Sequence, residues 1–168
     1  MVALNSKFDI LRGWPNSSAV QEDFVIGTGG GGDSHPHLQG QWVSLADNSN
    51  GSMVTVDHLA DTTSAAALSC YLIIEGLDDH SSKFANRVTC LLGGGYIVRI
   101  PETAPNAFGG GSSYRCFKAN VTASNFAVGQ FAKVVGGLLE NEAARTVATV
   151  GQIIARDVNN GTVDLLVF

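Results

Sequence analysis

Residues 147–167 read VATVGQIIARDVNNGTVDLLV, and this stretch decides the fold class. Two runs rich in β-branched residues, 147–158 and 162–167, flank Asn159, Asn160 and Gly161. Asn and Gly tolerate the positive φ angles that tight hairpin turns require. The stretch therefore predicts an antiparallel hairpin.

Similar strand signals recur upstream. Residues 41–45 alternate polar and apolar side chains, the polar stretch 47–51 supplies a turn, and residues 52–56 return as a second strand. Residues 66–75 form an apolar run that predicts a buried strand. Many short strands with turn signals about every 8–12 residues predict a mainly β fold, a small antiparallel β-barrel or sandwich.

The middle of the chain continues this pattern. Residues 87–92 and 96–100 flank three consecutive glycines, Gly93 to Gly95, and we expect the two runs to form a hairpin. We further expect a loop at 101–111, strands at 114–119 and 126–135, and helical composition only at 138–145 (LLENEAAR).

The first 34 residues have a different character. They contain large apolar side chains with no sustained period of 2 or 3.6, and they end in the glycine run Gly27-Thr28-Gly29-Gly30-Gly31-Gly32. Large apolar side chains that follow neither a strand nor a helix period predict an extended arm that packs on a partner. The glycines predict a flexible joint. We therefore expect an arm at 1–34 and a β-barrel domain at 35–168. The residues expected at the arm's interface are Phe8, Ile10, Leu11, Trp14, Phe24 and Ile26.

Composition limits the classes of partner. Charged residues make up 15% of the chain, against roughly 25% in an average soluble domain, so the surface suits packing against another protein. The net charge is −5 and the 10 Lys and Arg residues are scattered, which argues against nucleic acid as a partner. No apolar run approaches the roughly 20 residues that cross a bilayer, and the first residues do not resemble a secretory signal. We expect no membrane partner and synthesis in the cytoplasm.

Metal-binding patterns are weak. Cys70, Cys90 and Cys116 form no CxxC pair, and each lies in an apolar stretch, so we expect them to serve as small core hydrophobes. His35-Pro36-His37 is the best candidate for a metal site, and no third ligand is fixed by the sequence. The partners considered for these histidines are Asp33, Asp57, His58 and Asp61. We predict no metal and no cofactor.

Catalytic patterns are weaker still. A phosphate loop requires Lys and then Ser or Thr after its last glycine, whereas Asp33-Ser34 follows Gly32. Gly111-Ser112-Ser113 lacks the second glycine of a nucleophile elbow. We predict no catalytic residues, and expect that the protein is not an enzyme.

The order of several short motifs resembles a known family. The motifs are the GQWVSL strand at 40–45, NRVTCL leading into GGYIV at 86–98, FAVGQ at 126–130, VGQIIA at 150–155 and GTVDLLV at 161–167. This succession is similar to the small β-barrel (β-tulip) decoration, or cement, proteins on the heads of tailed bacteriophages. The resemblance covers about residues 38–168.

The resemblance implies a structural virion protein without catalytic residues. Such a protein binds the outer surface of the capsid, usually as a homotrimer, and cements neighbouring major capsid subunits. Two alternatives stay open at this point. One is another β-rich virion part, such as a head-fibre base or tail component. The other is a metal- or carbohydrate-binding β-domain centred on His35, His37 and Trp42.

Overall fold

The computed structural model describes residues 9–12, 20–26, 39–46, 55–57, 70–75, 87–105 and 113–168. Within these ranges the chain consists of β-strands and irregular connections, with a single short 3₁₀ turn, η3 (Ala123–Asn125). Strand pairs are antiparallel except for β2 with β4. The predicted mainly β fold is confirmed.

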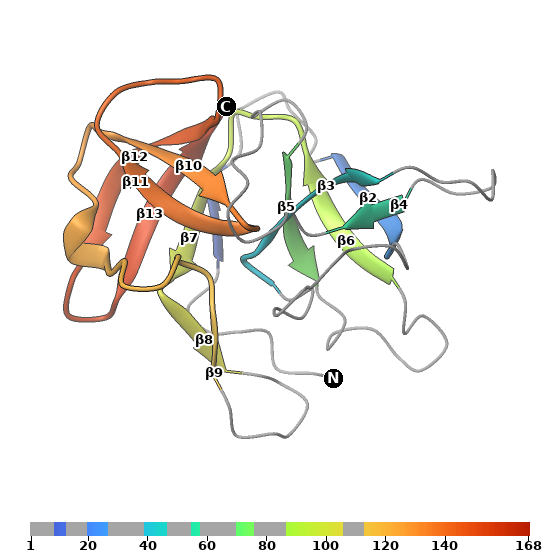
Figure 1. The fold of residues 1–168 in the computed structure, drawn as a ribbon, viewed down its shortest axis with the longest axis horizontal. Helices are drawn as coiled ribbons and strands as arrows, with labels where there is room; N and C mark the ends of the chain where they lie inside the picture. Colours follow the sequence, from blue (N-terminus) through green and yellow to red (C-terminus); the bar gives the residue numbers. More distant parts are fainter. Residues whose placement is uncertain are drawn as a thin grey trace.

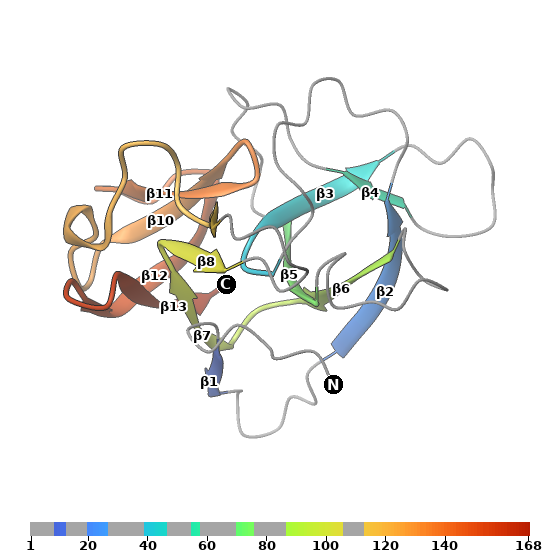
Figure 2. The same cartoon turned by 90° about the horizontal axis from the view of Figure 1, so that it is seen from below.

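Two sheets lie side by side and form two lobes (Figure 1). One is six-stranded, in the order β1-β7-β13-β12-β10-β11, and in the other the pairing of five strands closes into a ring, β2-β4-β3-β5-β6. Figure 2 shows the ring strands curving around their own interior beside the six-stranded sheet. The six-stranded sheet contains β1 (Asp9–Arg12), β7 (Ile97–Pro101), β10 (Phe131–Val135), β11 (Leu138–Glu142), β12 (Thr149–Asp157) and β13 (Thr162–Val167). The ring contains β2 (Val20–Ile26), β3 (Trp42–Ala46), β4 (Thr55–Asp57), β5 (Cys70–Glu75) and β6 (Arg87–Leu92), and a separate pair is formed by β8 (Thr103–Pro105) and β9 (Ser113–Arg115).

The ring strand β5 is buried on both of its faces. Leu72 and Ile74 belong to the large core shared with the six-stranded sheet, whereas Ile73 belongs to a smaller cluster with Val43 and Val88. Successive side chains of a strand point to opposite faces, so β5 contributes one face to the ring interior and the other to the contact between the lobes. Burial on both faces explains why this part of the 66–75 segment is continuously apolar.

The short segment before β3 joins the two lobes by hydrogen bonds. The Trp42 backbone N–H donates to the carbonyl of Gly137 in the β10–β11 turn (2.8 Å). Gln41 is fully buried, and its Nε2 donates to the carbonyl of Arg115 (2.9 Å). On the ring side, the Ile73 N–H donates to the carbonyl of Gln41 (2.9 Å). The lobes are therefore connected by polar contacts as well as by the shared core.

The hairpin predicted around Asn159-Asn160-Gly161 is confirmed as β12 and β13. Asp157 closes the turn, since the Asn160 N–H donates to Oδ1 (3.0 Å) and Asn160 Nδ2 donates to Oδ2 (2.7 Å). These hydrogen bonds favour the ionised carboxylate and lower the pKa of Asp157. The other predicted pair, β3 with β4, is also antiparallel in the structure.

The predicted hairpin around Gly93 to Gly95 is wrong. β6 and β7 both exist, but β6 pairs with β2 and β5 in the ring, whereas β7 pairs with β1 and β13 in the other sheet. The three glycines instead carry the chain from one lobe to the other. A Cβ on Gly94 would lie 2.0 Å from the backbone carbonyl carbon of Phe168, so only glycine permits this close approach.

Two further expectations differ from the structure. The stretch with helical composition, 138–145, begins with strand β11, because Gly136 (φ 60°) and Gly137 (φ 76°) form a two-residue turn that returns the chain antiparallel to β10. Of the strand expected at 126–135, only β10 forms. The Gly129 N–H donates to the carbonyl of Ile153 (2.8 Å), which fixes residues 126–130 as an irregular connection beside β12.

The N-terminal residues are not separate from the sheets. β1 lies at the edge of the six-stranded sheet, paired with β7, and β2 lies between β4 and β6 in the ring. The structure therefore differs from the expected division into an arm at 1–34 and a barrel at 35–168. The apolar residues of β1 and β2 show no shared period because the two strands belong to different sheets.

Candidate interaction face

The six-stranded sheet turns one face toward the shared core and the other away from it. Alternate residues of its strands belong to that core, among them Val98, Leu165, Ile153, Ala132 and Leu139. Their neighbours in each strand lie on the opposite face, because side chains alternate along a strand.

One row of paired residues crosses five strands of this face. Ile97 pairs with Leu166, Leu166 with Gln152, Gln152 with Phe131, and Phe131 with Glu142. All five residues are partly exposed. We call them the exposed row. Three of the five are large apolar residues, and they stay accessible at the middle of a wide sheet.

An aromatic and arginine cluster adjoins the row. The ring centroids of Phe131 and Phe168 are 6.4 Å apart, and the Arg145 guanidinium carbon lies 4.7 Å from the Phe168 ring centroid. Phe168 is 43% exposed and Val147 is 85% exposed. Aromatic residues and Arg are enriched in the most energetically important positions of protein interfaces.

A second pair of exposed aliphatic residues flanks the row along β12. Ile154 is 40% exposed and occupies an irregularity between Ile153 and Ala155, where the register with β13 shifts by one residue. Such a bulge adds an unpaired residue to one strand and redirects its side chain. Val128, 61% exposed, precedes Gly129, whose N–H is bonded to Ile153. We call the exposed row together with Phe168, Ile154 and Val128 the exposed sheet face.

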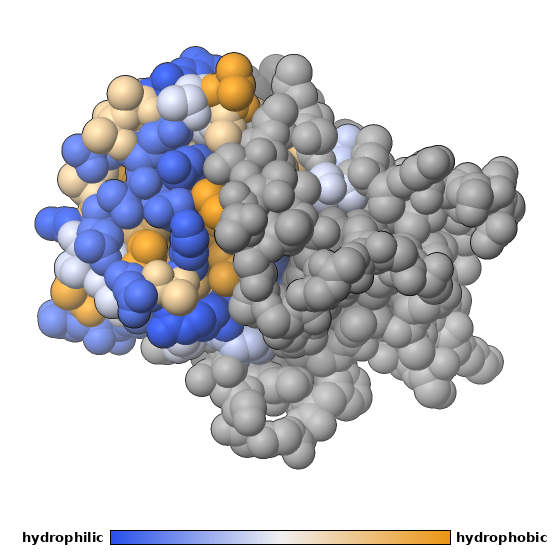
Figure 3. All heavy atoms as spheres, in the orientation of Figure 1, coloured by the Kyte–Doolittle hydropathy of each residue, from blue (hydrophilic) through white to orange (hydrophobic). Residues whose placement is uncertain are grey.

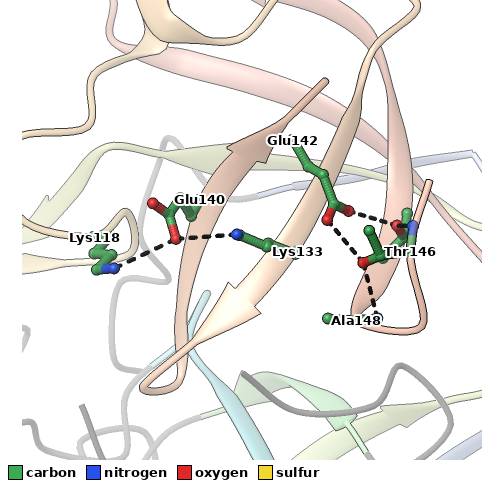
Figure 4. Close-up of polar contacts among 7 residues, drawn as sticks. Lys118, Lys133, Glu140, Glu142, Thr146 and Ala148 are labelled. Atoms are coloured by element: carbon green, nitrogen blue, oxygen red, sulfur yellow. Dashed lines mark hydrogen bonds and ion pairs between the residues drawn. The ribbon is translucent and has the colours of Figure 1, made fainter. Parts of the chain in front are cut away.

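Five charged residues on this side of the sheet form ion pairs within the chain. Arg99 binds both carboxylate oxygens of Asp164, with Nε–Oδ1 and Nη2–Oδ2 distances of 2.8 and 2.9 Å. Glu140 lies between Lys118 and Lys133, at 3.4 and 3.8 Å (Figure 4). A partner covering this face would meet one excess positive charge among these groups.

A carboxylate and two hydroxyls fix the loop that carries Arg145 and Val147. Glu142 accepts hydrogen bonds from the Thr146 and Thr149 hydroxyls at 2.7 and 2.6 Å (Figure 4). The Thr149 Oγ1 in turn accepts from the Thr146 N–H (2.7 Å). This network holds the β11–β12 connection in one conformation beside the aromatic cluster. On the side drawn in Figure 3, hydrophilic and hydrophobic residues interleave over this lobe.

The predicted interface residues are not brought together by the structure. Ile10 pairs with Val98 in the six-stranded sheet, whereas Phe24 and Ile26 lie in the ring strand β2. Leu11 lies in β1, and Phe8 and Trp14 are outside the described residues. The exposed sheet face was not identified from the sequence.

The structure describes only two of the residues considered for metal or sugar binding, Trp42 and Asp57. Trp42 is 2% exposed and packs in the shared core, so its ring offers no open platform for a sugar. Asp57 lies in β4, and His35, His37, Asp33, His58 and Asp61 lie outside the described residues. Within the described ranges no three His, Cys, Asp or Glu side chains gather as a metal site would require.

The cysteines lie in apolar surroundings, as predicted. Cys90 and Cys116 are fully buried, and Cys70 is partly buried against the shared core. Burial raises the pKa of the Cys70 thiol to about 11 and raises that of Cys116 further.

Comparison with known proteins gives no relative. No family model, curated protein or solved structure matches the chain. Among the residues that the structure describes, no helix has the length and apolar character needed to cross a bilayer.

Proposed function

We propose that this chain is a structural virion protein that binds the outer surface of a bacteriophage capsid and cements neighbouring major capsid subunits, as a homotrimer. The exposed sheet face carries the proposal. It combines a row of accessible apolar residues with an aromatic and arginine cluster, which is the composition of a protein interface. The order of sequence motifs that resembles capsid cement proteins supports the same function.

The electrostatics of the face favour broad contact with another protein. Burying an unpaired ion in a protein costs on the order of several kcal/mol. Arg99 is neutralised by Asp164, and Lys118 and Lys133 share Glu140, so docking would leave one excess positive charge among these five residues. Each contact can then be modest, because many copies on one shell add their affinities.

Co-sedimentation with capsid shells tests the proposal. The shells are assembled from the major capsid protein of a tailed bacteriophage, without their natural decoration. Ile154→Asp introduces an uncompensated carboxylate in the exposed sheet face and should reduce the bound fraction at least tenfold, which corresponds to about 1.4 kcal/mol. Val158→Asp is the matched control, since Val158 is 53% exposed in the β12–β13 turn and lies outside the face.

Three outcomes decide between the parts of this proposal. Loss of binding in Ile154→Asp with normal binding in Val158→Asp supports the exposed sheet face as the contact. Equal binding of both variants shows that the contact lies elsewhere on the molecule. Failure of the unmodified protein to co-sediment with the shells refutes the capsid function.

A further inference from the structure

The first two strands of the chain complete two different sheets. β1 adds the last strand to the edge formed by β7, and β2 closes the ring between β4 and β6. The remaining strands keep an unbroken order without them: β7-β13-β12-β10-β11 in one sheet and β4-β3-β5-β6 in the other. β1 and β2 are therefore additions to two sheets that are already continuous.

The attachments of these strands are unequal. β1 pairs with β7 at three positions, with an irregularity between Ile10 and Arg12. β2 pairs with β6 over six positions, but with β4 over only two, Val25 with Thr55 and Ile26 with Val56, and these two are parallel. Parallel pairing is slightly less stable per residue than antiparallel pairing, so the ring is weakest between β2 and β4.

The covalent connection that follows β2 is long. β2 is joined to the next described segment by residues 27–38, which include Gly27 and the four consecutive glycines Gly29 to Gly32. Twelve fully extended residues span up to about 40 Å, which is about the diameter of a domain of this size. Nothing in the length of this connection restricts β1 and β2 to the chain that carries them.

A second copy of this chain offers the same acceptors. Its β7 edge and its gap between β4 and β6 have the register that β1 and β2 already satisfy. We propose that β1 and β2 are exchanged between copies of this chain, so that each copy completes the two sheets of its neighbour. Exchange of an identical element is a low-cost route to an oligomer, because it reuses contacts that the single chain already makes.

Local concentration decides which arrangement forms. The covalent connection holds a chain's own strands at an effective concentration of the order of millimolar, so a dilute chain keeps its own β1 and β2. Exchange between copies competes with pairing inside one chain when the concentration of neighbouring copies reaches a similar value. On a shell covered with copies this condition is met, and that statement alone rests on the proposed function.

A single substitution makes exchange visible. Glu22 pairs with Cys90 in the β2–β6 register, so Glu22→Cys places a second thiol opposite a native one. Opposed residues in antiparallel strands have Cα atoms about 4.5–5.5 Å apart, within the range that a disulfide spans. Asp23→Cys is the matched control, because Asp23 pairs with Thr89 and no thiol lies opposite it.

Both variants are unfolded in urea, refolded at micromolar and at about millimolar concentration, oxidised, and separated on a non-reducing gel. The expected result for Glu22→Cys is an intrachain disulfide at low concentration and covalent multimers at high concentration. Cys70 and Cys116 are present in both variants, so multimers that arise from them appear equally in the control.

The other results overturn the proposal. An intrachain disulfide at both concentrations shows that each chain keeps its own strands. Absence of any disulfide specific to Glu22→Cys refutes the β2–β6 register on which exchange depends. Equal multimers in both variants show that the multimers do not depend on the pairing of residue 22 with Cys90, which refutes exchange of β2 between copies. None of these results affects the co-sedimentation comparison of Ile154→Asp with Val158→Asp, so failure of exchange and failure of capsid binding are distinguishable.

Discussion

Gly94 lies where the connection between the lobes passes the end of β13, and replacing it by alanine should destabilise the protein strongly. The added Cβ would lie 2.0 Å from the carbonyl carbon, 2.4 Å from the carbonyl oxygen and 2.9 Å from the Cα of Phe168. All three atoms belong to the backbone, so no side-chain rotation relieves the overlap. Ordinary van der Waals contact of a Cβ begins near 3.4 Å. The backbone at Gly94 and the backbone at Phe168 must therefore separate by about 1.4 Å.

The magnitude follows from the hydrogen bonds that hold these segments together. The Gly95 N–H donates to the carbonyl of Val167 (2.8 Å), the Val167 N–H donates to the carbonyl of Tyr96 (2.8 Å), and the Phe168 N–H donates to the carbonyl of Val150 (3.0 Å). Losing or stretching two or three such bonds at about 1 kcal/mol each gives a cost of about 2–3 kcal/mol. That is a large part of a typical domain stability of about 5–15 kcal/mol.

Gly93→Ala is the internal control. Gly93 has a φ of +80° and no atom within 4 Å of the position of a Cβ, so alanine there meets only the cost of a left-handed backbone, about 1 kcal/mol. Urea unfolding followed by tryptophan fluorescence measures both variants. If Gly94→Ala costs no more than Gly93→Ala, the close approach of the connection to Phe168 is incorrect.

Two further predictions concern polar groups. Gln41→Ala removes the hydrogen bond that a fully buried side chain donates to the carbonyl of Arg115 in β9, and it should cost about 1–3 kcal/mol in urea unfolding. Gln152→Ala removes a partly exposed amide that water can replace, and it should cost less than about 1 kcal/mol. Equal costs would contradict the role of Gln41 in joining β9 to the segment before β3. Asp157 should titrate below 3.8 when its carboxyl carbon is followed by NMR, and Asn160→Ala should raise that pKa. Because the folded-state pKa is the lower one, the ionised group stabilises the fold above the unfolded pKa, and this contribution is lost as the pH falls through the folded value. An unchanged pKa in Asn160→Ala would contradict the turn geometry.

Local signals in the sequence predicted much of the strand content. The β12–β13 hairpin follows from the turn residues between two β-branched runs, and the buried strand β5 follows from its continuous apolar stretch. Both signals depend on residues close together in the chain.

The pairing partners of strands could not be predicted in the same way. Gly93 to Gly95 look like a hairpin turn between two strands, yet β6 and β7 find their partners in different sheets, through contacts with β2 and β13 that lie far away in the sequence. Glu140 and Glu142 favour helix by composition, but the turn at Gly136 and Gly137 and the pairing with β10 place them in a strand. Tertiary contacts override weak local preference in both cases.

The exposed sheet face was missed because it is defined by register across strands. Its residues come from β7, β10, β11, β12 and β13, and no segment of the sequence contains more than a few of them. The sequence does not show that Ile154 is exposed, because it stands beside another isoleucine, Ile153, that belongs to the core. Only the irregularity in the pairing of β12 with β13 separates the surroundings of the two side chains. A surface of this kind becomes recognisable only when the strand order is known.

The strand order also constrains how the protein is made. β13 lies between β7 and β12, so the six-stranded sheet has no central strand until residues 162–167 have left the ribosome. Until then β7 exposes an unpaired edge of the kind that nascent chains use to aggregate. Pairing Leu166 with Ile97 then closes a long loop, and folds dominated by such distant pairs reach the native state in about milliseconds to seconds rather than microseconds. The six-stranded sheet therefore assembles only after β13 has been made, and the yield of the protein in a cell should depend on how well β7 is protected until then.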